Sequence, residues 1–73
     1  MHVEITGLES GWPDITIEIR KEEIDKLCTL LRQLQSEKRD HFHIFNNFID
    51  DAGVGDIEFS LNNNADDSMS CDW

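Results

Sequence analysis

The chain has no Lys or Arg outside residues 20–39, although it carries 16 acidic residues over 73 positions and a formal net charge of −10. All but four of those acidic residues lie outside this segment. Nucleic acids and anionic membranes bind clustered positive charge, so this composition disfavours both as ligands. It favours a basic protein partner or a bound cation instead.

Cysteine and long apolar runs are also scarce. Cys28 and Cys71 are too few for a disulfide scaffold, and we expect both to be free thiols in a reducing compartment. No stretch approaches the roughly 20 apolar residues of a membrane span, and the chain does not open on a basic segment followed by an apolar run. These absences predict a cytoplasmic protein without a signal peptide.

The motifs of common enzyme sites are missing as well. There is no nucleophile elbow, no phosphate-binding glycine loop and no Cys-x-x-Cys. The glycines of Gly53-Val54-Gly55 precede a predicted strand and indicate a turn, and the Asp residues around them lack the spacing of an EF-hand loop. One helix on one sheet offers little concavity for a substrate. We therefore expect no enzymatic activity and no cofactor.

What the chain does contain is alternation of polar and apolar residues with the period of two that half-buried strands show. Between the second and third of these segments, residues 21–38 place apolar side chains at helical spacing, with acidic residues in the first turn and basic residues at the end. The pattern predicts an α+β domain over residues 1–61 with the order ββαββ, in which one helix packs on one face of a four-stranded, mainly antiparallel sheet. The predicted strands are 2–6, 14–20, 40–45 and 56–61.

The remaining segment, residues 62–73, is polar and aperiodic, which predicts a disordered acidic tail. A single domain of this length has a thin core and marginal stability. One helix covers only one face of the sheet, so the second face meets water or a partner. Dimerisation through a sheet edge or through the open face would add stability.

The sharpest local feature is the pair His41 and His43, which share one face of a strand because they are two positions apart. The alternation places further polar groups and one aromatic side chain on the same outer face. One interpretation is a partner-binding face with Phe45 as the apolar anchor. Its predicted members are Glu4, Glu18, His41, His43, Phe45 and Glu58.

A second interpretation of the same residues is a divalent-metal site made by His41, His43 and Glu58, since two imidazoles and a carboxylate are common ligands of zinc. A third is an ordinary solvated sheet face. Trp12 and Phe48 lie outside the predicted core, where each would either anchor a partner or fold back to cap the domain.

Residues 41–47 (HFHIFNN), a glycine-containing loop and residues 55–59 (GDIEF) resemble small bacterial immunity proteins of polymorphic toxin systems and neighbouring uncharacterised families. The resemblance covers the last third of the chain and the order of its elements. It implies a protein that binds a toxin enzyme and occludes its active site. An acidic sheet face would suit the basic substrate-binding surface of a nuclease toxin.

Overall fold

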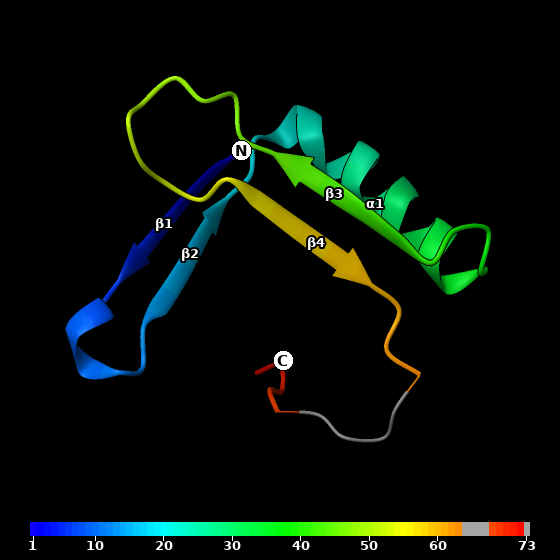
Figure 1. Ribbon diagram of the computed structural model, residues 1–73. Coiled ribbons are helices and arrows are strands. Elements are labelled where there is room, and N and C mark those ends of the chain that lie inside the picture. Colours follow the sequence, from blue (N-terminus) through cyan, green and yellow to red (C-terminus); the bar gives the residue numbers. More distant parts are fainter. Residues whose placement is uncertain (64–67, 73) are drawn as a thin grey trace.

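The computed structural model of the chain describes residues 1–63 and 68–72. The order of elements is strand, strand, helix, strand, strand, as predicted, and the α+β class is confirmed (Figure 1). A short 3₁₀ helix, η1, lies in the first connection. The elements are β1 (His2–Thr6), η1 (Leu8–Ser10), β2 (Asp14–Glu18), α1 (Lys21–Gln35), β3 (His41–Phe45) and β4 (Asp56–Ser60).

The strands form two separate antiparallel hairpins, β1–β2 and β3–β4, and in the described residues no ladder joins one to the other. The predicted single four-stranded sheet is therefore not confirmed. Figure 1 shows the β1–β2 hairpin pointing away from β3 and β4. The period of two in a sequence shows which side chains share a face, but it carries no information on which strand edges meet.

The helix begins with a reciprocal contact between Arg20 and Glu23. The Glu23 N–H donates to the Arg20 carbonyl oxygen at 2.9 Å, and the Arg20 N–H donates to the Glu23 carboxylate at 3.1 Å. The amino group of Met1 also donates to this carboxylate at 2.7 Å. This charged hydrogen bond and the one from the Arg20 backbone lower the pKa of Glu23 to about 2. The first turn is thus organised by a carboxylate, without a Ser, Thr, Asn or Asp cap.

The helix ends at Gln35, three residues before the predicted end at Lys38. The Lys38 N–H turns back to the Gln33 carbonyl oxygen at 3.0 Å. The Glu37 N–H donates to the Leu34 carbonyl oxygen at 3.1 Å, and Glu37 is left-handed, with φ 62°. These two bonds form a Schellman motif, which usually has glycine at the left-handed position. No glycine stands at this position to mark the end of the helix, which is why the predicted end was wrong.

Replacing Glu37 by glycine should raise the free energy of unfolding by about 0.5–1 kcal/mol. The left-handed conformation costs a residue with a Cβ roughly 1–2 kcal/mol, and the greater chain entropy of glycine offsets part of the gain. Glu22→Gly is the matched control, because it puts glycine in the first turn of α1 and should lower stability by about 1 kcal/mol. Urea unfolding of both variants at one protein concentration measures the difference. A Glu37→Gly variant less stable than the parent would contradict the motif.

The core is very small and lies between α1 and the β3–β4 hairpin, where Figure 1 shows the helix running behind β3. Leu34 and Phe42 are the buried hydrophobic residues among those described. The Phe42 ring stacks on Phe59 across the hairpin with centroids 4.9 Å apart. Trp12 is 88% exposed, so it does not fold back to cap this core, and Phe48 is exposed as well.

The remaining sequence predictions concern the cysteines, the membrane and the carboxyl-terminal tail. Cys28 and Cys71 are both free and exposed. Among the described residues, no helix is long and apolar enough to cross a membrane. The predicted disordered tail falls partly on residues 64–67 and 73, which lie outside the described residues. The described positions between 62 and 72 form neither helix nor strand.

Candidate functional site

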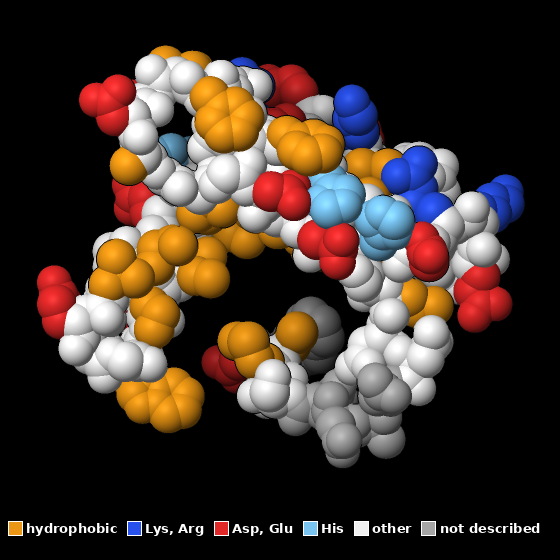
Figure 2. All heavy atoms as spheres, in the orientation of Figure 1, with side chains coloured by type: hydrophobic (Ala, Val, Ile, Leu, Met, Phe, Trp, Pro, Cys, Tyr) orange, Lys and Arg blue, Asp and Glu red, His pale blue; other side chains and the backbone are white. Residues whose placement is uncertain are grey.

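The outer face of the β3–β4 hairpin carries most of the predicted site. Phe42 pairs with Phe59 across the strands and faces α1, so the neighbouring positions point to the opposite side. His43 pairs directly with Glu58, and Phe45 lies opposite Asp56. Figure 2 shows the two imidazoles side by side among carboxylates on this surface. The prediction that His41, His43, Phe45 and Glu58 share one outward face agrees with this arrangement.

Both imidazoles are held through the same ring nitrogen. His41 Nδ1 lies 2.6 Å from the Asp40 carboxylate, and His43 Nδ1 lies 2.8 Å from the Asp56 carboxylate. In the neutral imidazole, an Nδ1–H that donates to a carboxylate leaves Nε2 as the basic nitrogen. A carboxylate behind the ring is the arrangement that orients histidine ligands at many metal sites. Asp40 and Asp56 are the site residues that the sequence patterns did not single out.

Ligand atoms of the two imidazoles and of one carboxylate lie close together on this face. His41, His43 and Glu58 each offer a ligand atom, and the three atoms lie within 4.8 Å of one another. His43 Nε2 is 3.3 Å from Glu58 Oε1. Two ligands of a tetrahedral zinc ion lie about 3.3 Å apart, given bond lengths of roughly 2.0–2.1 Å. The His43–Glu58 pair therefore already has the spacing of two zinc ligands.

The negative charge of this face comes from carboxylates, and two of them, Asp40 and Asp56, are hydrogen-bonded to the imidazoles of His41 and His43. The hydrogen bond between Asp40 and His41 lowers the pKa of the Asp40 carboxyl group, because it favours the ionised form. Phe45 stacks on the His43 ring with centroids 5.4 Å apart and remains 70% exposed. The face thus combines fixed negative charge, two oriented imidazoles and one exposed aromatic ring.

Glu4 and Glu18, predicted to belong to the same face, lie on the other hairpin. They form a second cluster with His2, again with ligand atoms within 4.8 Å of one another. His2 Nε2 is 3.0 Å from the Glu4 carboxylate, and this hydrogen bond, assisted by the charges of Glu4 and Glu18, raises the pKa of His2. The predicted single contact face is therefore divided in two, because β1 and β2 do not join the sheet of β3 and β4.

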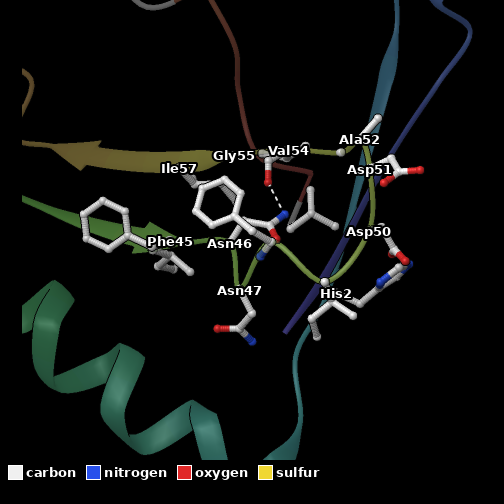
Figure 3. A pocket seen from close by; sticks show the side chains of 15 residues that line it. His2, Phe45, Asn46, Asn47, Asp50, Asp51, Ala52, Val54, Gly55 and Ile57 are labelled. Atoms are coloured by element: carbon white, nitrogen blue, oxygen red, sulfur yellow. Dashed lines mark hydrogen bonds between the residues drawn. The ribbon is translucent and has the colours of Figure 1, made fainter.

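The loop between β3 and β4 encloses a hollow of about 390 Å³, which no pattern in the sequence predicts. Figure 3 shows residues 46–55 curving around it, with His2 at its side. Asn46 holds the loop at its base, because its side chain donates to the Val54 carbonyl oxygen and accepts the Phe48 N–H at 2.6 Å. Asn directly after a strand favours such contacts with the backbone of a following turn, so this residue type could have indicated an ordered loop. The hollow is lined by Asp50 and Asp51, which disfavour anionic ligands.

Comparison with known proteins adds no relative. A scan against protein-family models finds no match, and searches of curated proteins and of solved structures find no similar protein. The function is therefore inferred from the geometry of the two hairpins and from the charge of the chain.

Proposed function

We propose that the chain is a non-enzymatic protein-binding module of the immunity type, which neutralises a basic toxin partner through the outer face of β3–β4. The observation that supports the proposal best is the composition of this face. Asp56 and Glu58 lie beside Phe45 on it, and no Lys or Arg occurs between residue 39 and the end of the sequence. Such a surface is complementary to the cationic substrate site of a nuclease.

Each part of the face has a distinct role in this proposal. The carboxylates attract the partner over distances of several ångströms and accelerate association. Phe45 is the apolar anchor, since it is exposed and already held against the His43 ring, so little side-chain entropy is lost when it is covered. Glu4 and Glu18 extend the acidic surface onto the β1–β2 hairpin.

Recovery of the tagged protein from its own source lysate at low salt, followed by native mass spectrometry, identifies the partner. With that partner, the association rate constant should fall at least about tenfold between 50 and 500 mM salt, because the attraction is screened. Phe45→Ala should mainly increase the dissociation rate, whereas Leu8→Ala, at a similarly exposed apolar residue in η1, should not. An association rate indifferent to salt would contradict the proposed electrostatic role.

Divalent-metal binding is the second candidate function, favoured by the convergence of His41, His43 and Glu58. The two carboxylates behind the imidazoles would hold them in the tautomer that a zinc ion requires. Titration of the metal-free protein with zinc against a chromophoric chelator tests this directly. One ion bound per chain with a dissociation constant below about 1 µM would support a metal site, because surface clusters without a built site bind zinc far more weakly.

A further inference from the structure

The β1–β2 hairpin has an apolar face that the described part of the chain leaves uncovered. Val3 pairs with Ile17 and Ile5 pairs with Ile15, so these four side chains share one face of the hairpin. Ile5, Ile15 and Ile17 are 40%, 63% and 42% exposed. Figure 2 shows hydrophobic side chains gathered over this hairpin, beside the open gap in the middle of the molecule. A two-stranded hairpin with a bare apolar face is marginal in water.

The helix is uncovered on one flank too. Leu34 is buried, but Ile24 and Leu31 are exposed, and so is Cys28 between them. Positions 24, 28 and 31 share one side of a helix because they are four and three residues apart. The apolar stripe of α1 is thus broader than the surface that its own hairpin covers.

The chain exposes more surface than a compact protein of the same mass. The chain exposes 6923 Å², whereas a compact protein of 8.5 kDa exposes roughly 4,700 Å². Even if residues 62–73 contributed all the surface of an unfolded segment, roughly 2,000 Å², the rest would still exceed a compact chain of its size by about 800 Å².

From this surplus we infer that a second copy of this chain covers the isoleucine face of β1–β2, so that the protein is an obligate dimer. The surplus belongs to the chain as a whole, and its size of about 800–2,200 Å² is comparable to the roughly 1,000–2,500 Å² that each subunit buries in an obligate homodimer. The face suits such an interface because its paired residues are all aliphatic, while the charged residues of this hairpin lie on the other side. In a dimer with a two-fold axis, the same apolar patch of each subunit packs against its copy.

A basic partner is the less suitable occupant of this face, since it would find no carboxylate there. Ionic strength separates the two interactions. Two chains of charge −10 repel each other, so salt should strengthen the dimer, whereas salt should weaken binding of a basic partner to the β3–β4 face. The dimer can therefore be tested without identifying any other protein.

Sedimentation equilibrium of the full chain, with a chelator and a reductant present, measures the mass. We expect about twice 8.5 kDa for the parent at micromolar concentration. Ile15→Lys should weaken the dimer about 100-fold or more, since it places an unpaired charge in the interface. The change lowers the net negative charge, so electrostatic repulsion alone would predict the opposite result. Thr16 pairs with Glu4 on the polar face of the hairpin, away from the isoleucine residues, so Thr16→Lys should leave the dimer intact.

A monomeric parent at micromolar concentration would overturn the inference, as would equal dimer affinity of the two lysine variants. Either result would mean that another occupant, or none, covers the isoleucine face. If Ile15→Lys fails to fold, Ile15→Ala decides the question. It should remain folded and dimerise about tenfold more weakly than the parent, while Thr16→Ala should dimerise normally. Equal affinities of these two alanine variants would overturn the inference.

Discussion

Phe42→Ala should leave about half of the protein unfolded at 25 °C. Phe42 is 3% exposed, stacks on Phe59 and is one of two buried hydrophobic residues in the described chain. Truncation of a buried phenylalanine costs about 3–5 kcal/mol. A 73-residue domain has roughly 4–11 kcal/mol of stability in total, and the small core here places this protein at the low end. Far-UV circular dichroism and urea unfolding measure the loss.

Phe45→Ala is the matched control, because it removes the same ring from the same strand on the opposite face. Phe45 is largely exposed, so its truncation should change the free energy of unfolding by no more than about 0.5 kcal/mol, apart from the lost stacking on His43. A Phe42→Ala variant with a cooperative transition close to that of the parent would mean that the core lies elsewhere, for example in a dimer interface.

If the metal-binding candidate is right, His43→Ala should weaken zinc binding at least about 100-fold. His43 is central to the cluster, since its Nε2 is 3.3 Å from Glu58 and its ring lies 5.2 Å from that of His41. Without it, two ligands remain on an exposed surface. Loss of a residue that only orients a ligand already costs 10–100-fold in affinity, and loss of the ligand itself costs more. Competition with a chromophoric chelator measures the change.

Two further variants distinguish one zinc site shared by several ligands from independent zinc binding by single histidines. Asp56→Asn removes the charge behind the His43 ring and should weaken zinc binding by an intermediate 10–100-fold. His2→Ala removes an imidazole from the other hairpin and should leave the affinity of the β3–β4 site unchanged. Equal effects of His2→Ala and His43→Ala would show that the histidines bind zinc independently, which would rule out the convergent site.

The outer face of β3–β4 shows which placements a local sequence pattern can predict and which it cannot. The i, i+2 spacing of His41 and His43 places both imidazoles on one side of any strand, and β3 realises that placement. Glu58 could be assigned to the same face only by assuming that the last two strands pair, which they do. The Asp40 and Asp56 contacts depend on rotamers and on cross-strand register, and neither is encoded in a period of two.

Sequence alone determined the type and order of the four strands and the helix, which side chains share a face of each, and the acidic character of everything outside residues 20–39. Each follows from periodicity or from charge, which are properties of neighbouring residues. Only the tertiary structure decided that β1–β2 stands apart from β3–β4, that Glu4 and Glu18 therefore leave the predicted face, and that the isoleucine face stays uncovered. Those outcomes depend on which strand edges and apolar faces meet, and contacts between distant segments leave no periodic trace in a single chain.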